Sequence, residues 1–238
     1  YTKYVGALSA AFVLAMDEHL HLYTLIALYL ALGAWADADR WAGRLYAQRE
    51  EMVPATIHMY LAFVALAWIA YGKLDEARAV LDEQLATLPQ GSASSFALIP
   101  IAIAYGHLHL AQEKPEALFA GLGERIRPYR EAGFIRLLAD EYWLRGRAEM
   151  ALGHFDAAQE ALLKARETAE AQEERAMLWR ILVSLADVEE ACGEAGVADM
   201  LRDQAREVVS YIAEHAGELR DMFLAWPEVQ AFLTGKLK

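Results

Sequence analysis

Cysteine and proline are both scarce in this sequence. Its single cysteine, Cys192, cannot form an internal disulfide, and one thiol cannot build a metal cluster. We therefore expect a reducing, cytoplasmic setting. Proline occurs only six times in 238 residues, while Ala, Leu, Glu and Arg are abundant and β-branched residues are few. This composition favours helices throughout and predicts an all-α fold.

Positive charge is also in short supply. The chain has 22 Lys and Arg against 34 Asp and Glu, which gives a formal net charge of −12. A surface of that sign repels phosphate backbones, so we expect no nucleic-acid partner. Apolar residues make up 56% of the chain, which excludes a disordered segment.

The sequence lacks a long membrane-spanning run and the common cofactor signatures. The most apolar stretch, Pro54 to Tyr71, is shorter than the roughly 20 residues that cross a bilayer, and it contains His58. We expect a buried helix there and no membrane partner. No P-loop, dinucleotide-binding glycine motif or G-x-S-x-G elbow is present, so we expect no cofactor and no catalysis.

A turn motif recurs along the chain at a nearly constant interval. Each copy is a turn followed by a charged or polar step and an alanine, and the alanines at 38, 77, 117, 158 and 198 are 39, 40, 41 and 40 residues apart. Glycine at 33, 72, 153 and 193 is suited to a left-handed helix end. In the third copy Gln112 replaces this glycine, and Pro115 begins the next helix. We expect the alanine to lie where two helices approach closely.

Two helices per copy predict a stack of helical hairpins. The first helix of each pair is expected at residues 21–32, 54–71, 95–111, 134–152 and 175–192. The predicted organisation is a single solenoid with a truncated first unit at 1–17, pairs at 18–53, 54–92, 93–131, 132–171 and 172–216, and a cap at 217–238.

The turn residues resemble the tetratricopeptide repeat. The second copy carries Trp68, Gly72, Ala77, Leu81 and Pro89 at the motif's spacing, and the fourth carries Tyr142, Gly146, Gly153, Ala158, Leu162 and Ala165. The standard unit has about 34 residues, whereas this one has near 40. The resemblance implies antiparallel helix pairs in a right-handed superhelical solenoid.

Longer units of this kind resemble the C-terminal sensor arrays of bacterial signalling ATPases, including maltose-regulator-type transcription activators and AAA-type ATPases linked to nucleotide cyclases. The stretches 205–215 and 218–229 resemble the ends of the cyclase-linked chains. In that family the array binds a partner or effector and restrains the ATPase, so the resemblance implies a role in regulation and no catalytic residue.

The first helices of stacked pairs line a concave wall, which is the usual binding face of such arrays. We predict that a partner meets the wall through these residues: Tyr23, Met59, His109, Trp143, Arg147, Arg180 and Asp187. The two arginines would hold a carboxylate or a phosphate. Close helix packing alone is the competing interpretation of these positions.

Three other features have simpler interpretations. Glu18 and His21 stand three apart, but a helical di-iron site needs further ligands, so a polar helix junction is favoured. Cys192 is expected to be a small buried side chain. The basic stretch 124–130 could receive an acidic partner, although a solvated helix end is the simpler interpretation.

These observations predict a non-catalytic module that binds a protein or peptide partner, or a small effector, with metal sites absent. The alternative is a scaffold that associates with copies of itself to form a homo-oligomer.

Overall fold

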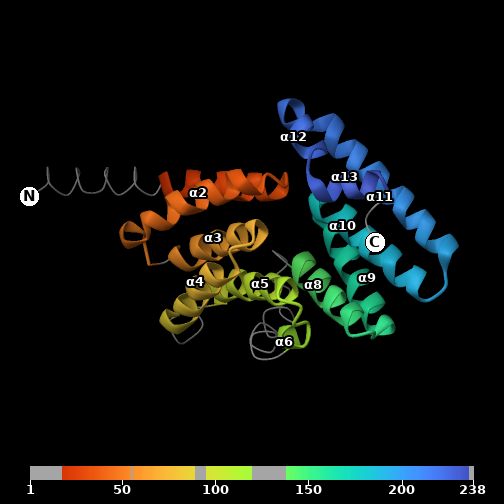
Figure 1. Cartoon of the computed structure of the whole chain (residues 1–238), viewed down its shortest axis with the longest axis horizontal. Helices are drawn as coiled ribbons and strands as arrows, with labels where there is room; N and C mark the ends of the chain where they lie inside the picture. The colour runs from red at the N-terminus through yellow and green to blue at the C-terminus, as the bar shows by residue number, and fades with distance from the viewer. Residues whose placement is uncertain (1–17, 55, 89–94, 120–137, 236–238) are drawn as a thin grey trace, which may run out of the picture. The chain divides into compact units, whose positions relative to one another are not determined.

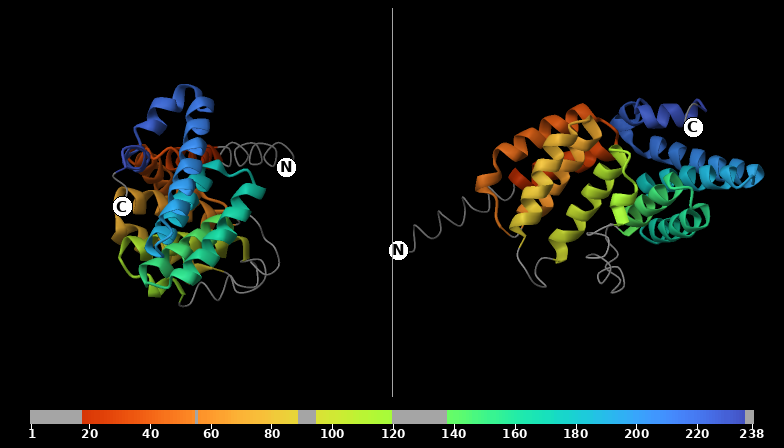
Figure 2. Two further views of the ribbon diagram at one scale, coloured as in Figure 1. Left: turned by 90° about the vertical axis from the view of Figure 1, so that its right-hand side faces the viewer. Right: turned by 60° about the horizontal axis from the view of Figure 1, so that its bottom comes forward.

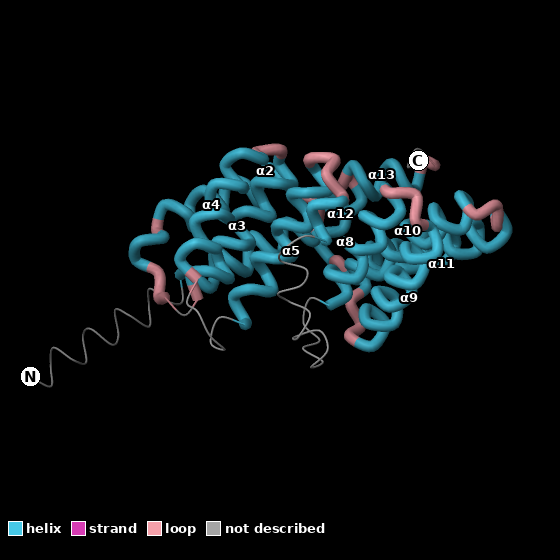
Figure 3. The backbone as a smooth tube through the Cα atoms, turned by 90° about the horizontal axis from the view of Figure 1, so that it is seen from below, coloured by secondary structure: helices cyan, strands magenta, loops and turns pink. Residues whose placement is uncertain are grey.

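A computed structural model describes residues 18–54, 56–88, 95–119 and 138–235 (Figure 1). Every described residue lies in a helix, a turn or a loop, and no strand occurs among them (Figure 3). The prediction of an all-α fold is therefore confirmed. The truncated unit at 1–17 and the basic stretch 124–130 lie outside the described residues.

The chain divides into two compact units, a first unit at Tyr1–Ala104 and a second unit at Tyr105–Lys238. In the first unit a helix at residues 18–31 is followed by α2 (Trp35–Ala47), the short η1 (Arg49–Glu51), α3 (Ile57–Tyr71) and α4 (Leu74–Thr87). The helix α3 packs on both α2 and α4, which explains why it is apolar nearly all round. Helix α5 (Ser95–Ala111) begins in this unit and ends in the next.

The second unit continues with α6 (Glu116–Phe119), α8 (Leu138–Ala151), α9 (Phe155–Ala171), α10 (Arg175–Ala191) and α11 (Ala195–His215). Each of α8, α9 and α10 packs on the helix that follows it, and α8 also contacts α10 (Figure 2). The chain ends with η3 (Gly217–Leu219), α12 (Arg220–Leu224) and α13 (Pro227–Leu233). Consecutive helices therefore pack pairwise, as the repeat predicts.

The turns between paired helices share one backbone pattern. Positive φ angles occur at Gly33 (66°), Gly72 (95°), Gly153 (78°) and Gly193 (88°). At each of them the next backbone N–H donates to a carbonyl five residues back, as from His154 to Glu149. This pairing satisfies the free carbonyls at a helix end, and it requires a left-handed residue.

The third turn corrects one detail of the sequence analysis. Its left-handed residue is Glu113, with a φ of 56°, and not Gln112. The same backbone bonds form there, from Glu113 to Leu110 and from Lys114 to His109. The hydrogen bonds of the helix end therefore hold a non-glycine residue in a conformation that side chains disfavour.

The repeated alanines lie in the helix contacts in four of the five copies. Ala38, Ala77, Ala158 and Ala198 are fully buried. Ala117 is only half-buried, because the turn before it is one residue closer than in the other copies. The contact between α8 and α9 is especially close, since a Cβ atom added to Gly146 would lie 3.3 Å from the carbonyl oxygen of Ala158.

Within the described part of the chain, no helix combines the length and the apolar character needed to span a bilayer. The apolar run that ends at Tyr71 forms α3, which is a helix of 15 residues inside the first unit.

Candidate functional site

The second unit contains a pocket of about 720 Å³ whose walls come from α8, α10, α11 and α13. Four of the residues predicted to meet a partner lie in it, namely Trp143, Arg147, Arg180 and Asp187. Met150 and Val183 join them from the same helix faces. We call this the α8–α10 pocket.

Helical spacing brings these side chains together. On α8, residues 143, 147 and 150 follow one another at intervals of four and three, and on α10 residues 180, 183 and 187 follow at intervals of three and four. Residues at these intervals share one helix face. Since α8 and α10 contact each other, the two faces line one wall of the pocket.

Trp143 of the α8 face contacts side chains of both helices. Trp143 is 6% exposed, and its indole N–H donates to the hydroxyl of Ser184 at 3.0 Å. The guanidinium groups of Arg147 and Arg180 lie 5.3 Å and 5.9 Å from its ring centroid. Cations at this range are attracted by the aromatic face, so the ring holds both arginines near the pocket.

Arg180 is held by the C-terminal helix. It pairs with Glu228 of α13 at 2.8 Å, and its guanidinium lies 4.5 Å from the ring centroid of Trp226. Trp179, beside it on α10, meets Trp226 edge to face at 5.6 Å. These contacts hold α13 against α10. They also neutralise the charge of Arg180 through Glu228, a residue of the same chain.

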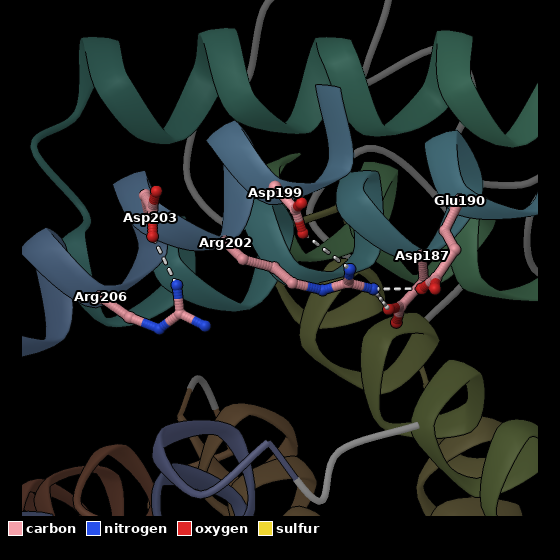
Figure 4. Close-up of polar contacts among 6 residues, drawn as sticks. All are labelled: Asp187, Glu190, Asp199, Arg202, Asp203 and Arg206. Atoms are coloured by element: carbon pink, nitrogen blue, oxygen red, sulfur yellow. Dashed lines mark hydrogen bonds and ion pairs between the residues drawn. The ribbon is translucent and has the colours of Figure 1, made fainter. Parts of the chain in front are cut away.

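Arg202 of α11 is held by the carboxylates of α10 (Figure 4). It pairs closely with Glu190, and its distance to the carboxylate of Asp187 is 3.5 Å. One turn further along α11, Arg206 pairs with Asp203 at 2.5 Å. Burial raises the pKa of Asp187 even though Arg202 and Arg147 act in the opposite direction. Asp187 is therefore an incompletely compensated carboxylate at the edge of the pocket.

Arg147 differs from the other pocket arginines. Among the described residues, Arg180, Arg202 and Arg206 each form an ion pair, and Arg147 forms none. Burial lowers the pKa of Arg147, and the positive charge of Arg180 adds to this effect, while Glu228 and Asp187 oppose it from a longer range. A guanidinium remains charged in spite of such a shift. The pocket therefore contains a partly desolvated guanidinium whose N–H groups donate to no carboxylate of the described residues.

Two further ionisable groups lie close to these arginines. Burial, together with the charges of Arg180 and Arg147, lowers the pKa of His107 to about 3, and its ring centroid lies 5.8 Å from that of Trp143. The imidazole is therefore neutral at pH 7. Burial and the nearby Glu174 raise the pKa of Asp140 to about 6, against the effect of Arg180. Neither group belongs to the lining of the pocket.

The remaining predicted contacts lie elsewhere. Tyr23 and Met59 belong to the first unit, where Tyr23 packs against Phe63 with ring centroids 4.8 Å apart. His109 is in the second unit but outside the pocket lining, and its ring stacks on Tyr105 at 5.9 Å. The structure thus groups only the α8 and α10 positions into one site.

Two of the simpler interpretations can be compared with the structure. Glu18 accepts hydrogen bonds from Arg44 at 2.9 Å and Gln48 at 3.1 Å, which lower its pKa, so it forms a polar junction with α2 as expected. The expectation of a buried Cys192 is wrong, because the thiol is exposed. Cys192 is the residue that ends α10, at the start of the turn to α11.

The residues of the site that follow α10 were not predicted from the sequence. Arg202 and Arg206 are four apart on α11, and Glu228 and Phe232 are four apart on α13. These intervals show that the two residues of each pair lie on one face of their helix. The repeat pattern does not predict that either face packs near α8. No protein-family model matches the chain, and no curated protein sequence matches it either.

Proposed function

We propose that this chain is a non-catalytic binding module and that the α8–α10 pocket takes up a negatively charged group of its partner. The observation that supports this is the unpaired guanidinium of Arg147 in the pocket wall. Removing a charged group from water is unfavourable unless an opposite charge meets it. An anion from a partner would supply that charge.

The charges of the pocket agree with an anionic partner. Its lining has four arginines and three acidic residues, namely Asp187, Glu190 and Glu228. Three of these arginines are already paired: Arg180 with Glu228, Arg202 with Glu190, and Arg206 with Asp203. Arg147 is therefore the cation of the lining that an anion from a partner would meet.

The wider setting remains a proposal based on the repeat. The pairwise packing of consecutive helices supports this setting, and we propose that the helix pairs form a right-handed superhelical array of the tetratricopeptide kind. In such an array the bound partner is a peptide, a protein domain or an effector, and we propose that the module regulates a larger signalling ATPase or a transcription regulator. Turnover by the purified chain on a broad substrate panel would contradict this assignment.

The test follows the side chain of Arg147 directly. The Nε–Hε resonance of Arg147 is recorded by NMR during titration of the 238-residue chain with sodium acetate and with inorganic phosphate. We expect a saturable shift with at least one anion, because guanidinium N–H groups donate to the bound oxygens.

The control variant is Arg166→Gln on α9, where Arg166 pairs with Glu170 outside the pocket. Arg147→Gln should abolish the anion-dependent shifts of the pocket residues, and Arg166→Gln should leave them unchanged. Equal responses of both variants, or no shift with any anion, would refute the proposal.

Self-association is a second candidate function, because α11 exposes apolar side chains. Met200 is 61% exposed and Val197 is 40% exposed on that helix. Light scattering over a dilution series should show an oligomer in the unmodified chain and a monomer in Met200→Glu if α11 is the contact. A monomer at every concentration would exclude the scaffold.

A further inference from the structure

We infer that the α8–α10 pocket selects a carboxylate that is carried on an apolar body. Such a ligand is either a small arylalkanoic or aliphatic acid or the free C-terminus of a chain that ends in a hydrophobic residue. This inference rests on the proposed function and specifies its ligand.

The charge balance favours a single negative charge. Arg180 is already paired with Glu228, Arg202 with Glu190 and Arg206 with Asp203, which leaves Arg147 as the one cation of the lining without an ion pair. Asp187 and Glu228 act on Arg147 through their fields. A second negative charge on the ligand would be repelled by these carboxylates. A monocarboxylate therefore fits better than a phosphate dianion, and its two oxygens match the planar fork of a guanidinium.

The other wall of the pocket explains the apolar body. Met150 of α8, Val183 and Trp179 of α10, and Phe232 of α13 line it beside the arginines. Trp179 and Phe232 are already 1% and 4% exposed, whereas Met150 is only partly buried and remains open to water. An attached ring or alkyl chain would displace water from Met150 and would bury its own apolar surface, which gains the free energy of apolar burial.

The size of the pocket sets a limit on the ligand. A volume of about 720 Å³ lies within the range of roughly 300–1,000 Å³ that is usual for small-ligand sites. It can hold a small acid or the last few residues of a peptide, but not a folded domain.

The first experiment compares three probes by NMR titration and calorimetry with the whole chain. Phenylacetate has both the carboxylate and the ring, acetate has the charge alone, and phenylacetamide has the ring alone. We expect phenylacetate to bind at least about tenfold more tightly than acetate, since burial of a ring is worth that factor or more. We also expect it to bind at least about tenfold more tightly than phenylacetamide, because the charge-assisted bonds to Arg147 are lost.

Two methionine variants test the apolar wall. Met150→Gln should weaken phenylacetate and leave acetate unchanged, because Met150 lines the pocket. Met222→Gln is the matched control, since Met222 is a partly buried methionine on α12 outside the pocket. Equal effects of the two substitutions would overturn the inference.

A further pair of probes distinguishes the two sources of the carboxylate. A short acetylated peptide that ends in phenylalanine is compared with its C-terminal amide and with phenylacetate. Tighter binding of the peptide acid than of phenylacetate indicates a chain terminus, and the reverse order indicates a free small acid. Either order supports the inference, provided that the amide binds at least about tenfold more weakly than the acid.

Failure of the inference differs from failure of the proposed function. If acetate or phosphate shifts the Arg147 resonance and phenylacetate binds no more tightly than acetate, the pocket binds anions without the selectivity inferred here. Tighter binding of phosphate than of phenylacetate would also overturn it. If no anion shifts Arg147, the proposed function fails together with the inference.

Discussion

Substitution of Gly146 by alanine tests the close contact between α8 and α9. A Cβ atom at this position would lie 2.5 Å from Cγ and 2.7 Å from Cδ2 of Leu162, and 3.3 Å from the carbonyl oxygen of Ala158. Leu162 is fully buried, and its Cγ is not a flexible end. The two helices must therefore move apart or Leu162 must leave its rotamer.

The expected magnitude is a balance of two terms. Overpacking of a close-packed contact costs about 1–3 kcal/mol. Replacing a glycine inside a helix by alanine otherwise stabilises the helix by about 1 kcal/mol. The two terms leave a net loss of about 0–2 kcal/mol in the free energy of unfolding. Because backbone as well as side chain opposes the new methyl group, we expect Gly146→Ala to fall in the upper half of that range.

The control is Gly196→Ala on α11, where nothing lies within 4 Å of the added Cβ atom. It should stabilise the chain slightly, by at most about 1 kcal/mol. The two glycine substitutions should thus shift the urea midpoint in opposite directions. A stabilising effect of Gly146→Ala would refute the close contact.

A double-mutant cycle with Leu162→Ala tests the same contact quantitatively. The Leu162→Ala substitution alone should cost about 2–5 kcal/mol because it leaves a cavity. The methyl group of Gly146→Ala would partly fill that cavity. The double variant should therefore be at least about 1 kcal/mol more stable than the sum of the two single-substitution effects predicts. Additive effects would mean that residues 146 and 162 are not in contact.

Three further predictions concern the second unit. The pKa of Asp140 rises from 3.8 to about 6 on folding, so ionisation of this carboxyl opposes folding at higher pH. Asp140→Asn should therefore stabilise the chain above pH 6, by up to about 3 kcal/mol, and the gain should disappear as the pH falls towards 4. A stabilisation that does not depend on pH in urea titrations would contradict this. Ser184→Ala should cost about 1–3 kcal/mol in the same assay, since it leaves the buried indole N–H of Trp143 without its acceptor, and an unchanged midpoint would show that this bond does not form. Gly153→Ala should cost about 1–2 kcal/mol in thermal unfolding, because its φ of 78° is unfavourable for alanine, and a raised midpoint would argue against the left-handed turn.

Much of the fold could be predicted from the sequence, because local features specify it. Glycine at 72, 153 and 193 marks the end of one helix, and the alanine five residues later marks the contact with its partner. The apolar stretch of α5 was predicted with its observed bounds, Ser95–Ala111. Glu113 was missed because nothing in its chemistry indicates a left-handed residue, and only the backbone bonds of the turn show it.

The candidate site was predictable only where it follows one helix face. The spacing of Trp143 and Arg147, and that of Arg180 and Asp187, placed these side chains on facing helices of neighbouring pairs. The contribution of Glu228 could not be predicted, because it depends on how α13 packs on α10, and no periodic pattern specifies that contact. The unpaired state of Arg147 is likewise a property of the assembled unit.

The most direct test of the account is a crystal structure of the chain grown with phenylacetate. The account predicts a carboxylate within about 3 Å of the guanidinium nitrogens of Arg147, with the ring against Met150 and Phe232. A bound phenylacetate at any other place, or a side chain of Arg147 that is paired with a carboxylate of the chain itself, would contradict it.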